Sequence, residues 1–286
     1  MTVDLIEGVA YQRVESPGCP LCGRNVPART IAAGFGMTAM VAECIDCRLA
    51  YQTPRPTPEA SRAYMDMRWR SNDAYVADGE QQRARARKQL DVLAGLGARG
   101  ARLLDFGAGA GAFVAAARAR GWDAAGVERS TPAVERALRE RDVRLHADLA
   151  TAGKDFDVVT LWDVVEHLRD PRETVAALRA HVRPGGWMLF ETGNWESWNR
   201  LAAGDAWALY LFDHQYYFSP ASLQRMLADA GLVDFRLLPA GECPPPPAPA
   251  EGDAAARERW DAYQNGVARW PDHASIDIMV AAARNP

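Results

Sequence analysis

The chain has 286 residues, of which 48% are apolar and 24% are charged. This length allows one large domain, or one catalytic domain with a small appendage, at roughly 150 residues per domain. The apolar fraction is that of an ordinary globular protein and excludes a disordered or collagen-like chain. With 33 Lys and Arg against 37 Asp and Glu, the formal net charge is −4. No overall positive field therefore attracts nucleic acid or anionic lipid, and we expect neither as a partner.

Targeting signals and cysteine usage indicate the same compartment. The sequence lacks the run of about 18 apolar residues that predicts a transmembrane helix, and its first residues lack the features of a signal peptide. We therefore expect a cytoplasmic protein without a membrane partner. Four of the five cysteines form two pairs, Cys19 with Cys22 and Cys44 with Cys47, whereas Cys243 stands alone as a spare thiol. In a reducing compartment this spacing indicates metal binding rather than disulfides.

The two cysteine pairs predict a structural zinc ion. They read C-P-L-C and C-I-D-C, with 21 residues between them. Four thiolates in two turns provide the tetrahedral ligand set of a zinc ribbon, and four sulfur ligands leave no open position for catalysis. The alternative, a pair of redox-active C-x-x-C sites, lacks a thioredoxin-like context. We interpret residues 1–56 as a zinc-ribbon module with zinc as its structural cofactor.

Two helices are predicted between this module and the rest of the chain. The prolines of QTPRPTPEA disfavour helix before them, and T-P-E-A then places Pro58 at the first position of a helix. A second, charged helix continues from EQQRARARK to Gly97. Its basic segment, residues 83–88, is typical of the solvated face of a helix. We assign residues 57–99 to these linking helices.

From residue 100 onward, strands alternate with helices. Such alternation predicts an α/β fold in which helices cover both faces of a parallel sheet. We expect this domain to span residues 100–286, with Ser219 as the N-cap of its last regular helix. The expected strands are 101–106, 123–129, 156–165, 185–192, 233–239 and 275–283, and the expected helices are 107–121, 131–142, 171–182 and 218–232.

Two segments interrupt this alternation. Residues 195–218 contain many aromatic side chains, which we interpret as the lining of a pocket for a ring-bearing acceptor, although a helical hairpin packed on the domain explains the same residues. Residues 241–272 form a Pro-rich insertion that ends in a helix-like stretch. We interpret this insertion as an excursion from the fold, such as a flap.

A glycine-rich turn, LLDFGAGAG, follows the first strand of the α/β domain. Asp105 ends the buried strand, and Gly107, Gly109 and Gly111 lie in the turn that begins a helix. Glycines are needed where the backbone takes unusual dihedral angles and a ligand approaches the main chain closely. A second acid, Glu128, ends the next strand 23 residues later, where a carboxylate can hold two ribose hydroxyls.

At these residues the chain resembles the class I S-adenosylmethionine-dependent methyltransferases, whose fold is a Rossmann-like sheet. LLDFGAGAG is similar to the family's first motif, AGVERS to its second, and DFDVVTLWDVVEHLRDP and RPGGWMLFETGN to later ones. The resemblance implies S-adenosylmethionine as cofactor, whereas the alternative is a dehydrogenase or nucleotide-binding fold with a coincidental turn. The cofactor-binding residues that it implies are Asp105, Phe106, Gly107, Gly109, Gly111, Glu128, Asp148, Trp162 and Asp163.

The resemblance also implies a role for each of these residues. The turn passes beneath the amino-acid end of the cofactor, Asp105 supports the turn, and Glu128 binds the ribose. Asp148 is similar to the acid that meets the adenine amino group. Trp162 and Asp163 follow the strand beside the methionine moiety.

Methyl transfer needs alignment of the acceptor and, where the acceptor is an alcohol or an acidic carbon, a base. His167 is the first candidate base, because Glu166 and His167 follow the strand FDVVTLWDVV at the carboxyl edge of the expected sheet. Glu166 could orient the imidazole or bind substrate, and a structural role for either residue stays open. His214, in LYLFDHQYYFSP, is the second candidate.

The stretch CIDCRLAYQTPRPTPEASRAYM makes the chain similar to bacterial methyltransferases that carry an N-terminal zinc ribbon. It departs from them at Arg48, where Gly is common after the fourth cysteine. The resemblance implies a small-molecule acceptor, and we favour a hydroxyl of a sugar or natural-product intermediate. The alternatives are a nucleotide-sugar C-methyltransferase, a zinc-ribbon RNA methyltransferase, and a binding protein that keeps only the fold. The acceptor, the methylated atom and the oligomeric state are left open by the sequence.

Overall fold

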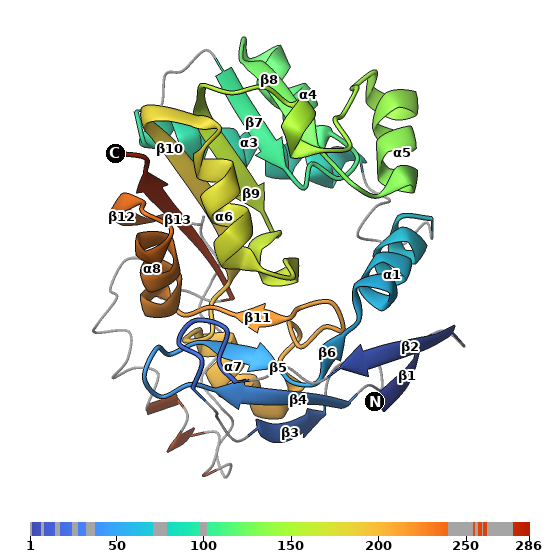
Figure 1. Cartoon of the computed structure of the whole chain (residues 1–286), viewed down its shortest axis with the longest axis vertical. Helices are drawn as coiled ribbons and strands as arrows, with labels where there is room; N and C mark the ends of the chain where they lie inside the picture. Colours follow the sequence, from blue (N-terminus) through green and yellow to red (C-terminus); the bar gives the residue numbers. More distant parts are fainter. Residues whose placement is uncertain are drawn as a thin grey trace. The chain divides into compact units, whose positions relative to one another are not determined.

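Figure 1 shows the computed structural model of the chain, which divides into two compact units. The ribbon unit comprises Met1–Ala60, Thr192–Met226 and Leu237–Val280, and the sheet unit comprises Ser61–Glu191, Leu227–Arg236 and Ala281–Pro286. The structure describes residues 2–6, 9–14, 18–24, 28–32, 38–70, 79–97, 102–239, 254, 257–258, 260–261 and 277–286.

A six-stranded sheet of order β12-β13-β10-β9-β7-β8 forms the core of the sheet unit. β7 pairs in parallel with both β8 and β9, and β9 pairs in parallel with β10. Its central strands β7 and β9 are mostly apolar, and almost all of their residues are buried, as in a sheet covered on both faces. The α/β fold predicted from the sequence is confirmed. The strands are β7 (Arg102–Phe106), β8 (Asp123–Val127), β9 (Phe156–Trp162), β10 (Val182–Gly193), β12 (Val233–Leu238) and β13 (Ile278–Arg284).

Hydroxyl side chains cap the first turns of α1 and α8. The hydroxyl of Thr57 accepts a hydrogen bond from Ala60 N at 3.1 Å, so Pro58 begins its helix as predicted. Ser219 Oγ likewise accepts from Ser222 N at 3.2 Å. Figure 1 shows α4, α5 and α6 around the sheet. The helices are α1 (Pro58–Arg70), α3 (Gly79–Gly95), α4 (Ala112–Ala119), α5 (Thr131–Arg141), α6 (Pro171–Arg179), α7 (Trp198–Ala203) and α8 (Pro220–Asp229).

The carboxyl ends of β7 and β9 meet at a topological switch point. From β7 the chain passes through α4 to β8 on one side, whereas β9 pairs with the other side of β7. In open α/β sheets, ligands bind in the crevice outside the carboxyl ends of the strands at such a point. The residues that follow Phe106 and Trp162, where these strands end, are therefore the place to look for a site.

The ribbon unit contains a four-stranded sheet of order β11-β5-β4-β3 and a three-stranded sheet of order β1-β2-β6. β4 and β5 form an antiparallel pair whose connecting turn holds the second cysteine pair. Tyr216 and Tyr217 of β11 pair with Tyr51 and Ala50 on the other edge of β5. The strands are β1 (Thr2–Ile6), β2 (Val9–Val14), β3 (Ala28–Ala32), β4 (Thr38–Glu43), β5 (Ala50–Gln52), β6 (Arg55–Pro56) and β11 (Tyr216–Tyr217).

The aromatic-rich segment, residues 195–218, therefore belongs to the ribbon unit, whereas the sequence pattern grouped it with the later domain. Trp195, Trp207, Tyr210 and Tyr217 are buried, and their ring centroids lie 5.3 to 6.3 Å apart in mostly edge-to-face pairs. These rings pack against one another, and the segment forms one short helix, a 3₁₀ turn and the strand β11 rather than a helical hairpin.

Some sequence predictions fall on residues that the structure does not describe. Cys243 and most of the insertion 241–272 lie outside the described residues, although residues 254, 257–258 and 260–261 are helical. Among the described residues, no helix combines the length and the apolar character needed to cross a bilayer.

Candidate cofactor site and metal centre

The glycine-rich turn after β7 is closely packed against the end of β9. Gly107 has φ +77°, and a Cβ at this position would lie 2.5 Å from Cγ2 of Val164. Gly111 is the N-cap of α4, so the turn ends where the first N–H groups of that helix begin. A side chain at Gly107 would both strain the backbone and collide with its neighbour, which explains why the sequence needs glycine there.

Glu128, directly after β8, is bonded to the main chain of this turn. Its Oε2 accepts a hydrogen bond from Gly109 N at 2.9 Å. Its Oε1 accepts from the N–H groups of Arg129 and Ser130, both at 2.8 Å. A carboxylate oxygen can accept two hydrogen bonds, so Oε2 keeps an acceptor position after these contacts. The carboxylate is thus held in place before any ligand arrives.

Asp105 lies beneath the turn and is 3% exposed. Its Oδ1 accepts a hydrogen bond from the hydroxyl of Thr160 at 2.8 Å. Burial raises the pKa of Asp105 to about 7, although the bond from Thr160 opposes this shift. The carboxyl group is thus buried and bonded to β9 just before the turn, and the supporting role that the sequence resemblance implies for it stays a prediction.

We expect Asp105→Asn to flatten the dependence of stability on pH. The pKa of Asp105 is about 7 in the folded chain and about 3.9 in an unfolded one, so the folded state binds more protons between these values. Stability therefore falls as pH rises through this window, by at most about 4 kcal/mol. The amide of the variant does not ionise, so it has no such pH-dependent loss of stability, and its oxygen still accepts the hydrogen bond from Thr160.

Denaturant unfolding at pH 5 and pH 8 measures this effect. Wild-type protein should lose more unfolding free energy between the two values than Asp105→Asn. Asp123→Asn, at a side chain that is 77% exposed, is the matched control and should follow the wild type. An Asp105→Asn profile that coincides with the wild-type profile would contradict the prediction.

A guanidinium group bridges two acids at the carboxyl ends of β9 and β10. Arg85 Nη2, from α3, donates to Asp163 Oδ2 at 2.5 Å and also to Glu191 Oε1. Burial and the negative charge of Asp163 raise the pKa of Glu191, while Arg85 opposes that shift. Sequence reasoning identified Asp163 but missed Arg85 and Glu191. The sequence signal for Arg85 was the basic run on α3, which the sequence analysis interpreted as the solvated face of a helix.

The remaining predicted cofactor residues lie along the same edge of the sheet. Phe106 and Trp162 end their strands, are both 8% exposed, and Trp162 packs edge-on against Phe113 with ring centroids 5.3 Å apart. Asp148 is exposed and caps a short 3₁₀ helix through a bond from Ala150 N at 3.0 Å. His146, two residues earlier, forms a parallel bridge with Val127, so Asp148 lies near the carboxyl end of β8.

The two candidate bases lie in different units. Glu166 and His167 belong to a short 3₁₀ helix, Val165–His167, which follows β9 in the sheet unit. Glu166 is 2% exposed, whereas His167 is half-buried. His214 is buried in the ribbon unit, where its ring centroid lies 6.4 Å from that of Tyr217.

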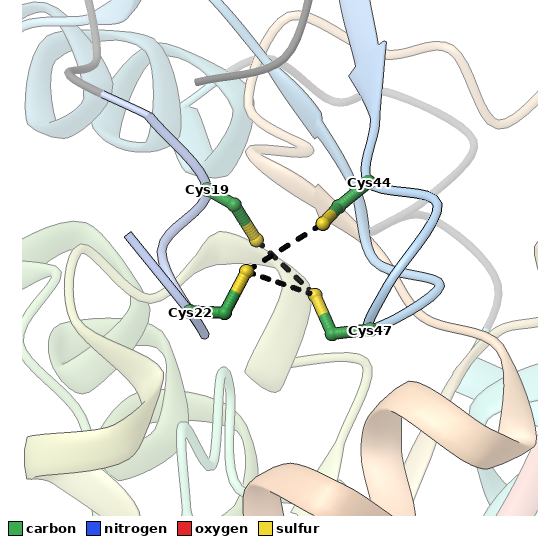
Figure 2. A group of neighbouring side chains, drawn as sticks. All are labelled: Cys19, Cys22, Cys44 and Cys47. Carbon is green, nitrogen blue, oxygen red and sulfur yellow. Dashed lines mark hydrogen bonds between the residues drawn. The ribbon is translucent and has the colours of Figure 1, made fainter. Parts of the chain in front are cut away.

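Figure 2 shows the four cysteines facing one another from two turns of the ribbon unit. The Sγ atom of Cys19 lies 3.2 Å from that of Cys47, and Cys22 Sγ lies 3.6 Å from Cys44 Sγ and 3.9 Å from Cys47 Sγ. Sulfur atoms around a tetrahedral zinc ion at about 2.3 Å are about 3.8 Å apart. Donor type and spacing therefore both fit zinc.

The two cysteine turns share one backbone geometry. Gly23 N donates to Cys19 O at 2.7 Å, and Arg48 N donates to Cys44 O at 2.8 Å. Gly23 and Arg48 both have positive φ, +73° and +59°. Arg48 therefore occupies a left-handed position, where glycine would carry no steric penalty, and the four cysteines still lie together.

Comparison with known proteins decides the family. Residues 79–236 match the family model described as "Methyltransferase domain". The chain belongs to this methyltransferase family. The fold and family predicted from the sequence, those of an S-adenosylmethionine-dependent methyltransferase with a Rossmann-like sheet, are confirmed.

Similar proteins include curated methyltransferases and solved structures. A ubiquinone biosynthesis O-methyltransferase of Thiobacillus denitrificans is 33% identical over 46% of this chain and 65% of that relative. The enzyme of the same name from Psychrobacter arcticus is 32% identical over 48% and 61%. The chain thus spans less than two thirds of the length of these relatives. A S-adenosylmethionine-dependent methyltransferase from Archaeoglobus fulgidus shares the fold, with TM-score 0.53 and 16% identity over 78% of this chain and 98% of that one.

Proposed function

We propose that this protein transfers a methyl group from S-adenosylmethionine to a hydroxyl of a small-molecule acceptor, such as a sugar or a natural-product intermediate. The observation that carries the proposal is the carboxylate of Glu128, bonded to the glycine-rich turn at the switch point of a methyltransferase sheet. The relatives named O-methyltransferases favour oxygen as the methylated atom over carbon. The net charge of −4 disfavours an RNA acceptor.

The residues at this edge suit the separate parts of the cofactor. Glu128 Oε2 retains an acceptor position for a ribose hydroxyl. The glycines at positions 107, 109 and 111 let the main chain of the turn come close to the amino-acid end. Asp148, exposed near the end of β8, offers an acceptor for the adenine amino group.

His167 is the proposed base. When bound, S-adenosylmethionine supplies a methyl group on a sulfonium, which is an activated leaving group. His167 follows β9 at the carboxyl edge of the sheet and is half-buried, so its ring can reach a ligand there. In this role the neutral imidazole would accept the proton of the acceptor hydroxyl while the new C–O bond forms and the methyl–sulfur bond breaks, with S-adenosylhomocysteine as the leaving group. Glu166, the buried neighbour, then holds the segment that carries the ring.

We also propose that Cys19, Cys22, Cys44 and Cys47 bind one zinc ion. The support is the set of four sulfur atoms, which all lie within 4.8 Å of one another. Four thiolates complete the coordination shell, so the metal stabilises the ribbon unit and takes no part in methyl transfer.

Incubation with methyl-labelled S-adenosylmethionine tests the proposal. Phenols, hydroxylated sugars, nucleotide sugars and RNA are offered as separate acceptors, and the position of the label is determined by mass spectrometry. We expect label on an oxygen of a phenol or sugar. Label on a sugar carbon or on RNA would contradict the proposed function, as would binding without any turnover.

We expect Glu128→Ala to weaken cofactor binding at least about tenfold. The variant loses charge-assisted hydrogen bonds to the ribose, each of which contributes about 1.5–3 kcal/mol, and also frees the turn at Gly109. Calorimetric titration with S-adenosylhomocysteine measures the loss. Glu173→Ala, at an exposed position on α6, is the matched control. Equal affinity of Glu128→Ala and wild type would remove Glu128 from the site.

A further inference from the structure

Trp69, in the last turn of α1, lies against the glycine-rich turn. A Cβ at Gly109 would come within 2.8 Å of two ring carbons of Trp69, Cη2 and Cζ2. The edge of the indole ring therefore rests on the main chain of Gly109. The same glycine donates its N–H to Glu128, so the ring lies next to the carboxylate proposed to hold the ribose. All three residues belong to the sheet unit.

Hydrogen bonds fix this face of α1 at the cofactor edge. Ser130 Oγ donates to Asp66 Oδ1 at 2.7 Å, and the N–H of the same serine donates to Glu128 Oε1 at 2.8 Å. Asp66 and Trp69 are three residues apart and so share one face of the helix. Figure 1 shows the end of α1 beside α5, the helix that begins directly after Ser130.

We propose that Trp69 is a cofactor-binding residue that forms an aromatic wall of the site beside Gly109. The proposal rests on the proposed function, because it needs S-adenosylmethionine to bind at the turn. The turn and Glu128 offer polar groups, whereas a nucleoside also needs apolar surface against its ring and ribose carbons. A half-buried indole supplies that surface, and its face attracts a cation such as a sulfonium.

Trp69 is less buried than another aromatic residue of the same helix. Tyr64, on the same helix, is 3% exposed and anchors α1, whereas Trp69 remains half-buried at the edge of the turn. Removing the indole should therefore leave α1 folded. We expect the effect to appear in ligand affinity and not in the stability of the ligand-free chain.

Calorimetric titration of the full chain with S-adenosylhomocysteine tests the inference. Trp69→Ala should bind about tenfold more weakly, which is the loss of one aromatic contact. Trp69→Phe keeps an aromatic face and should stay within about threefold of wild type. Trp122→Ala is the matched control, because Trp122 is a half-buried tryptophan before β8, at the opposite edge of the sheet. The affinity of Trp122→Ala for S-adenosylhomocysteine should equal that of the wild type.

The possible outcomes separate this inference from the proposed function. If Trp69→Ala binds S-adenosylhomocysteine as tightly as the wild type does, the inference is overturned and the proposed function stays intact. If the wild type does not bind S-adenosylhomocysteine, both the inference and the proposed function are overturned. A weaker Trp69→Ala whose ligand-free melting temperature falls further than that of Trp122→Ala assigns Trp69 to the structure of the turn, which also overturns the inference. Equal losses in both Trp69 variants, at unchanged melting temperature, would contradict the aromatic wall, because phenylalanine keeps an aromatic face.

Discussion

Replacing His167 by alanine should lower kcat by about 10²–10⁴-fold, with little change in cofactor affinity. A hydroxyl that is protonated at neutral pH needs a base when its oxygen attacks the methyl carbon, and His167 follows β9 at the carboxyl edge of the sheet. The wild-type rate should rise with pH as the imidazole loses its proton, because only the neutral ring accepts one. Methylation of an acidic phenol, which ionises without help, should survive the substitution.

Two further histidine variants make this result specific. His181→Ala alters a half-buried histidine of the same unit that precedes β10 at the amino edge of the sheet, and it should leave kcat unchanged. His214→Ala tests the second candidate, which is buried in the ribbon unit. Turnover abolished by His214→Ala but kept by His167→Ala, with folding and cofactor binding intact, would assign the base to the ribbon unit instead.

The fold of the sheet unit could be predicted because its signals are local. β7 and β9 are mostly apolar strands of five and seven residues, and Pro58 and Pro171 mark the first turns of their helices. The place of β11 could not be predicted in this way. Tyr216 and Tyr217 pair with β5, whose residues lie far away in the sequence, and a two-residue strand has no periodicity of its own.

The candidate site likewise combines residues that the sequence could identify with residues that it could not. Glu128 and the glycines lie within one strand-helix-strand unit, so their spacing alone indicates that they meet. Arg85 meets Asp163 and Glu191 only because α3 packs beside the ends of two strands, and an arginine in a basic run carries no local mark of such a partner. The contact of Trp69 with Gly109 depends in the same way on where α1 docks. Sequence reasoning finds residues of one motif and misses those that join from separate helices.

Loss of zinc should unfold the ribbon unit. Binding of structural zinc by four thiolates contributes about 10–16 kcal/mol at neutral pH, which is as large as the whole stability of a typical domain, about 5–15 kcal/mol. Protein purified without chelator should contain one zinc ion per chain, and Cys47→Ser or a strong chelator should expose the buried ring cluster. Trp195 and Trp207, which are 1% and 2% exposed, should then shift their fluorescence to longer wavelength.

The same variant separates a structural from a catalytic metal. The proposed cofactor residues, from the glycine-rich turn to Asp163, all lie in the sheet unit, so Cys47→Ser should keep its affinity for S-adenosylhomocysteine within about threefold while its ribbon unit unfolds. Cys243→Ser, at the cysteine outside the two C-x-x-C pairs, is the matched control and should keep both its zinc and its fluorescence. Purified protein without metal, or with the four cysteines joined as disulfides, would contradict the zinc assignment. Zinc that is present but leaves the fluorescence unchanged when it is removed would contradict its structural role, because a ribbon held by its own packing has no need of the ion.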